Sequence, residues 1–127
     1  MNKIELAKCF EEEAYDLMFY GFDKDDNLQK LANLSSRVLE KKDPFISYAF
    51  VSRISWYCFE NEKYKRALNV SAHERLVVNS YDEELMYFFA RDVAGANLQN
   101  ITHSMPKNSH LRKQLEREMR PLDEYNL

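Results

Sequence analysis

The chain has 127 residues and a mass of 15.2 kDa, which suits one domain and leaves no room for two independent cores. Only two glycines and three prolines occur, and this scarcity excludes turn-dense β-sandwiches, Rossmann units and P-loops. A net charge of −3 and a pI near 5.6 argue against a dedicated phosphate-backbone binder, and a hydrophobic share of 45% excludes a disordered chain.

The first predicted helix covers residues 3–20, where apolar side chains recur at spacings of three and four and a run of glutamates faces away from them. Gly21 closes this helix in a left-handed conformation. Its expected inward positions are Ile4, Ala7, Phe10, Ala14, Leu17 and Met18. A second helix follows an acidic turn, takes Asp26 and Gln29 as its capping box, and ends near Lys42.

The third predicted helix opens with an Asp-Pro pair, which combines an N-cap acid with the residue pre-set for the first helical position. This helix spans approximately residues 43–59. It is apolar around most of its circumference, so we place it at the centre of the fold. Residues 62–79 fit either two short helices or one kinked helix, with Ser71 and Glu74 as a capping pair for the later part.

A further helix begins at Ser80, has Glu83 at the capping-box distance, and stops at Gly95. Residues 97–105 form one short helix, because a proline follows directly. Ser109 is then in position to cap the last helix.

These elements predict an all-α fold, a compact single-domain bundle of five to seven helices with the central apolar helix at about 43–59. The domain covers residues 1–121, because Pro121 ends the last helix, and residues 122–127 form a frayed tail.

One internal similarity stands out from the rest of the sequence. Residues 43–50 align with residues 82–89 at an offset of 39 positions, and helical-hairpin repeats have periods of this order. Chance likeness between amphipathic helices explains the same match, since no third clean copy is present.

Metal and cofactor sites are not predicted. Asp23, Asp25 and Asn27 match the first, third and fifth positions of a calcium loop. Leu28 and Leu34, however, occupy the sixth and twelfth positions, which require Gly and Glu. The three histidines lack the spacing of zinc ligands. Cys9 and Cys58 lie far apart in apolar helical patterns, typical of buried thiols in a reducing compartment, and no base accompanies either. We therefore expect no cofactor.

An arginine and a histidine separated by six residues, Arg66 and His73, are the one candidate for catalysis. In an all-α chain of this length the pair resembles the signature of HEPN-family ribonucleases. The resemblance covers eight residues, and it implies metal-independent RNA cleavage in which the two side chains of each protomer meet at a dimer interface. The cation would stabilise phosphoryl charge and the imidazole would move protons.

Charge is unevenly distributed along the chain, which suggests binding surfaces. The candidate acidic surface comprises Glu11, Glu12, Glu13, Asp23, Asp25 and Asp26. A basic C-terminal region, which favours nucleic acid as a further alternative partner, comprises Lys107, Arg112, Lys113, Arg117 and Arg120. Tyrosines are abundant, and Tyr64 and Tyr81 are our candidates for interface aromatics.

The leading functional prediction is a non-catalytic protein–protein interaction module. Small, acidic, glycine-poor helical chains of this kind include inhibitors, immunity proteins and adaptors, some encoded by phages or mobile elements. We expect a cytoplasmic protein, because the first residues lack a signal peptide and no stretch approaches the ~18 apolar residues of a membrane span. Its partner would be another protein, most simply one that handles nucleic acid, with a homo-oligomer as a further possibility.

Overall fold

The computed structural model describes the chain apart from residues 21–24, 59–61, 94–96 and 126–127, and apart from the side chains of residues 20, 25–26, 56–58 and 120–125. The described part is all-α and holds eight helices, more than the five to seven predicted. Their bounds are α1 (Lys3–Tyr20), α2 (Asp25–Glu40), α3 (Pro44–Cys58), α4 (Glu62–Leu68), α5 (Val70–Asn79), α6 (Glu83–Asp92), α7 (Leu98–Ser104) and α8 (His110–Tyr125).

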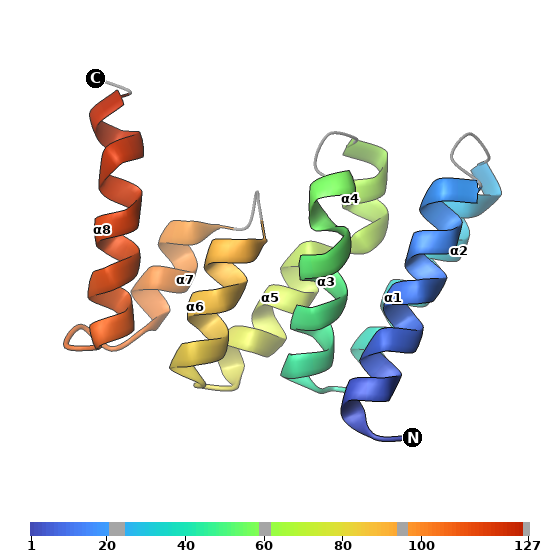
Figure 1. The fold of residues 1–127 in the computed structure, drawn as a ribbon, viewed down its shortest axis with the longest axis horizontal. Helices are drawn as coiled ribbons and strands as arrows, with labels where there is room; N and C mark the ends of the chain where they lie inside the picture. The colour runs from blue at the N-terminus through green and yellow to red at the C-terminus, as the bar shows by residue number, and fades with distance from the viewer. Residues whose placement is uncertain (21–24, 59–61, 94–96, 126–127) are drawn as a thin grey trace.

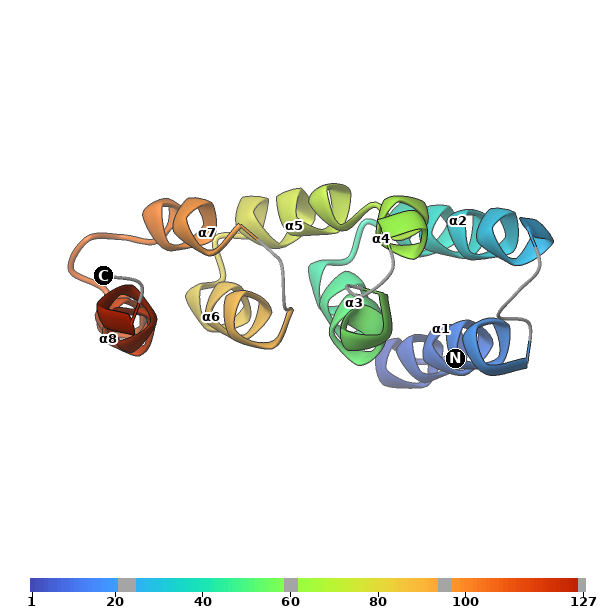
Figure 2. The same cartoon turned by 90° about the horizontal axis from the view of Figure 1, so that it is seen from above.

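The helices form a two-layered array. Viewed from above, α1, α3, α6 and α8 make one layer, and α2, α4, α5 and α7 make the other (Figure 2). The helices of the first layer run in parallel, with their N-termini along one edge, and the second layer runs in the opposite direction (Figure 1). This is the arrangement of successive helical hairpins stacked side by side.

The core fills the space between the two layers. Helix α3 lies at its centre and contacts α1, α2, α4, α5 and α6, in agreement with the prediction from its apolar circumference. Its residues Phe50, Val51 and Ile54 are buried, and Phe89 of α6 and Val93 directly after α6 continue the same cluster.

The two segments that align in sequence also share their hydrogen bonds. Asp43 caps α3 by accepting from the amide of Ile46, and Asp82 caps α6 by accepting from the amide of Leu85. The residues before these caps, Lys42 and Tyr81, have φ of 52° and 56°. Each of these residues donates its amide to the carbonyl three positions earlier. Positions 39 apart therefore adopt the same local structure.

Residues 62–79 form two helices, which settles the alternative left open by the sequence. The break lies at Asn69, whose φ of 54° and ψ of 57° are left-handed. It separates α4, which packs on α2, from α5, which packs on α3 and α6. Ser71 therefore does not cap α5, and Glu74 instead accepts a hydrogen bond from Asn100.

Helix ends depart from prediction at three other places. Helix α2 begins at Asp25, so Asp26 lies inside it, and Gln29 bonds to Asn33 rather than closing a capping box. Asp82 rather than Ser80 caps α6. Helix α8 continues past Pro121 to Tyr125, so the prediction that Pro121 ends this helix is wrong. The expected helix ends at Gly21 and Gly95 lie outside the described residues.

Candidate functional site on the first helix

A line of side chains runs along α1, all of them exposed apart from Glu11, which is half-buried. These residues, called the α1 stripe below, are Ile4, Lys8, Glu11, Glu12, Tyr15 and Phe19. Ile4 is 71% exposed, Tyr15 is 43% exposed and Phe19 is 47% exposed. The prediction that Ile4 points inward is therefore wrong.

The two aromatic residues of the α1 stripe stack on each other. The ring centroids of Tyr15 and Phe19 lie 4.2 Å apart, because residues four apart share one side of a helix. Large aromatic side chains with this exposure are common anchors of protein interfaces, since their burial removes much apolar surface from water at little entropic cost. The pair is thus an apolar platform already held in one arrangement.

Charged groups surround this platform. A shallow pocket of about 270 Å³ lies between α1 and α3, lined by Lys8, Glu11, Glu12, Tyr15, Asp16 and Arg53. Partial burial raises the pKa of Glu11, an effect that the nearby Arg53 guanidinium opposes. Glu12, Asp16 and Lys8 are exposed, and no ion pair of theirs occurs within the described residues. Their charges remain available to a partner.

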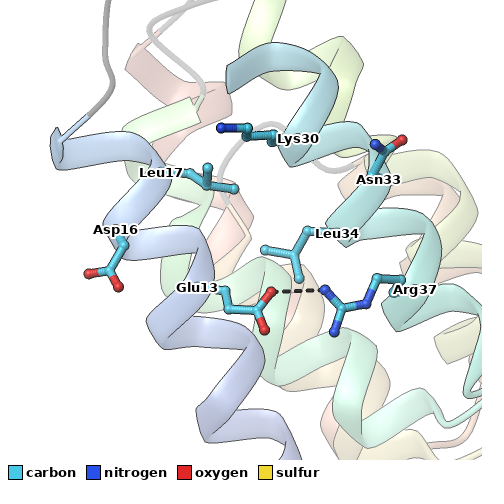
Figure 3. A pocket seen from close by; sticks show the side chains of 7 residues that line it. All are labelled: Glu13, Asp16, Leu17, Lys30, Asn33, Leu34 and Arg37. Atoms are coloured by element: carbon cyan, nitrogen blue, oxygen red, sulfur yellow. Dashed lines mark hydrogen bonds and ion pairs between the residues drawn. The ribbon is translucent and has the colours of Figure 1, made fainter. Parts of the chain in front are cut away.

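A second hollow lies at the end of the array, between α1 and α2, and measures about 420 Å³ (Figure 3). Leu17 and Leu34 point into it, and the Glu13 carboxylate and Arg37 guanidinium meet across it at 2.9 Å. The Arg37 guanidinium also lies 5.6 Å from the centre of the Phe10 ring. These contacts cover the apolar end of the first hairpin and engage Glu13, which leaves this residue less available for binding.

No protein-family model, no curated protein and no solved structure matches the chain. Functional inference consequently rests on the geometry of the site.

The proposed catalytic pair is not assembled in this structure. His73 is fully buried, whereas Arg66 is exposed on α4 beside a separate surface pocket. The His73 Nε2 lies 2.8 Å from the Ser35 hydroxyl, which itself donates to the Leu68 carbonyl, so His73 must be the donor in this pair. Burial lowers the pKa of His73 to about 4. A buried, neutral imidazole cannot meet an RNA phosphate, which counts against the ribonuclease alternative.

The basic C-terminal region is only partly available. Arg112 is held against the protein, because its guanidinium donates to the Met105 carbonyl and pairs with Glu116. Lys107, Lys113 and Arg117 are exposed, while the side chain of Arg120 lies outside the described residues. The exposed glutamates 116 and 118 interrupt these cations, so α8 presents mixed charge and not a continuous basic face.

The remaining predicted binding residues are scattered. Tyr64 is buried in the core, so its assignment to a binding surface is wrong. Tyr81 is 82% exposed in the turn before α6, far along the chain from the α1 stripe. Asp23 and the side chains of Asp25 and Asp26 lie outside the described residues. Of the predicted acidic surface, the structure brings only Glu11 and Glu12 together with the aromatic platform.

Other kinds of site find no support in the described residues. They contain no group of three or more His, Cys, Asp or Glu side chains arranged to hold a metal ion. None of the described helices combines the length and the apolar character needed to cross a bilayer.

Sequence reasoning missed Ile4, Lys8 and Phe19 as candidate binding residues. The spacing of Tyr15 and Phe19 was the available signal, because residues four apart lie on the same side of a helix.

Proposed function

We propose that this chain is a non-catalytic protein–protein interaction module that docks its partner on the α1 stripe. The stacked and exposed Tyr15–Phe19 pair carries the proposal, because it combines preformed apolar surface with flanking carboxylates on one rigid helix. A partner that fits has apolar side chains at its centre and positive charge around them.

The exposed apolar residues of α1 are grouped on one side of the helix. An isoleucine, a tyrosine and a phenylalanine lie there, and the pocket beside the tyrosine is bordered by Arg53 of α3. Exposed apolar side chains grouped on one helix mark a surface that another molecule covers.

We further propose that the chain acts as a small inhibitor or adaptor of a protein that handles nucleic acid. Such proteins carry basic surfaces that bind phosphate, and an acidic helix with an aromatic platform can occupy one. Glu12 and Asp16 supply the attraction at a distance, and Tyr15 and Phe19 supply the contact area.

Affinity capture with matched variants tests the proposal. The tagged chain is incubated with lysate of its source cells after nuclease treatment, beside Tyr15→Ala/Phe19→Ala and Tyr81→Ala chains. We expect one stoichiometric protein on the wild type and on Tyr81→Ala, and its loss on the double variant. Tyr81 is the control because it is the more exposed aromatic and lies outside the α1 stripe. Equal capture by all three chains would show that α1 is not the docking surface.

A further inference from the structure

The α1 stripe is complementary to itself when one copy is turned around. From the N-terminus it presents an apolar residue, a base, two acids and an aromatic pair, in the order Ile4, Lys8, Glu11 with Glu12, and Tyr15 with Phe19. The step from Ile4 to Lys8 and the step from Glu11 to Tyr15 each cover four residues, which is about 6 Å along a helix. The spacing from Ile4 to Lys8 therefore equals the spacing from Tyr15 back to Glu11.

We propose that the α1 stripe binds the α1 stripe of a second copy, with the two helices antiparallel about a two-fold axis. In this register Ile4 lies against Tyr15 of the second copy, and Lys8 lies against Glu11 and Glu12 of the second copy. A two-fold axis makes every contact occur twice, as in the isologous interfaces of most small homodimers. The inference rests on the proposed function, because it assigns that same surface a second occupant besides the basic partner.

Charge selects the antiparallel arrangement. A parallel pair would place Lys8 against Lys8 and acids against acids, and like charges in contact oppose association. In the antiparallel pair each ammonium meets the carboxylates of the other copy. Lys8 and Glu12 are both exposed and form no ion pair within the described residues, although the Lys8 charge acts on Glu11 of its own helix.

The same pairing covers Ile4 and Tyr15 of both copies. Ile4 is the most exposed apolar residue of the α1 stripe, and the stacked rings of Tyr15 and Phe19 offer it a flat apolar surface. The interface is formed by two single helices, so we expect a dimer whose population depends on protein concentration. A basic partner that binds the α1 stripe would compete with the dimer, which makes self-association a means of regulating the docking surface.

Sedimentation equilibrium of the purified chain over a wide concentration range tests the apolar part. We expect a monomer–dimer equilibrium in the wild type, and dimerisation weaker by about tenfold or more in Tyr15→Ala/Phe19→Ala, since central aromatic anchors dominate interface energies. Tyr81→Ala should dimerise as the wild type does. A chain that stays monomeric at every concentration, or a double variant that dimerises normally, would overturn the inference.

Mixing two charge variants tests the register and guards against misfolding. Lys8→Glu alone and Glu12→Lys alone each place like charges opposite each other in a homodimer, so each should dimerise more weakly than the wild type. An equimolar mixture restores both pairs and should form heterodimers. Absence of heterodimers from two variants with wild-type circular dichroism would refute this register.

The result also separates the two proposals. A monomeric wild type that still captures a protein through Tyr15 and Phe19 would remove the second copy and leave the proposed function intact. Loss of both dimerisation and capture would remove both.

Discussion

At the scale of single residues, the clearest feature is a buried polar contact that joins three helices of the second layer. Ser35 of α2, Leu68 of α4 and His73 of α5 meet through the Ser35 hydroxyl, and the ring of Phe50 lies 5.7 Å from the imidazole. Because Ser35 uses its only proton on the Leu68 carbonyl, the proton of the neutral imidazole lies on Nε2. The His73 Nδ1 is buried and has no hydrogen-bond partner. Protonation would leave a buried N–H without an acceptor.

Stability should therefore fall in mild acid. The pKa of His73 is 6.5 in the unfolded chain and about 4 in the fold, so the unfolded state binds a proton first as the pH decreases. Above pH 6.5 both states hold His73 neutral and the fold keeps its full stability. As the pH falls from 6.5 to 4, the free energy of unfolding decreases by about 3 kcal/mol in total. Urea unfolding at several pH values measures this slope.

The offset of 39 positions that relates the two aligned segments suggests the matched variant for His73. Leu34 lies 39 positions earlier and is also buried, so a leucine is compatible with that local structure. His73→Leu should remove this part of the pH dependence, while His103→Leu, at an exposed site, should retain it. An unchanged slope in His73→Leu would show that other groups cause the acid sensitivity.

At the scale of helices, the first-layer elements begin in the same way. Asn2, Asp43, Asp82 and Ser109 each accept a hydrogen bond from a backbone amide at the start of the following helix. Such caps satisfy amides that have no partner within the helix. Asp43 also pairs with Lys3 at 2.9 Å, which joins the starts of α1 and α3.

Removal of one cap should have a measurable and specific cost. Asp82→Ala should lower the free energy of unfolding by about 1 kcal/mol, because the Leu85 amide loses its acceptor. Glu84→Ala removes the same charge from the first turn of α6 without removing the cap, so it should cost less. Chemical denaturation of the two variants decides this, and equal losses would attribute the effect to charge alone.

Local signals explain which caps the sequence could predict. The Asp-Pro pair at α3 and Ser109 before α8 have one plausible geometry each, and both predictions agree with the structure. Ser80 and Asp82 compete for the start of α6, and the left-handed conformation of Tyr81 decides between them. That conformation depends on how α5 and α6 pack, which no local pattern contains.

At the scale of the whole molecule, the fold is a linear array with its most connected helix inside. Among the described residues, α3 packs against five other helices, whereas α8 packs mainly against two, α6 and α7. In such arrays each unit is stabilised mainly by its neighbours, and the ends open more easily than the middle.

Amide hydrogen exchange should follow this order. We expect the slowest exchange in α3 and faster exchange in α8, which is attached by bonds such as Tyr87 to Glu118 and Ser109 to Glu83. Mass spectrometry of peptic fragments measures it. Equal protection of α3 and α8 would indicate that the array opens only as one cooperative unit.

The all-α class and the position of α3 were predictable because apolar periodicity reports burial directly. The layered arrangement was not, because periodicity does not say which helix covers which. The candidate site was predictable only in part for the same reason. Glu11 and Glu12 stood out by charge, but the exposure of Ile4 depends on which sides of α1 the helices α2 and α3 cover.

The matched junctions at Lys42–Asp43 and Tyr81–Asp82 have a consequence for how such a chain can change in length. The segment between them, residues 43–81, begins and ends at the same backbone geometry, with an aspartate ready to start the next helix. A tandem copy of this segment would join its original through a junction that the protein already makes twice. The architecture therefore allows growth by whole modules, and a gene that encodes it can acquire a longer scaffold in a single event.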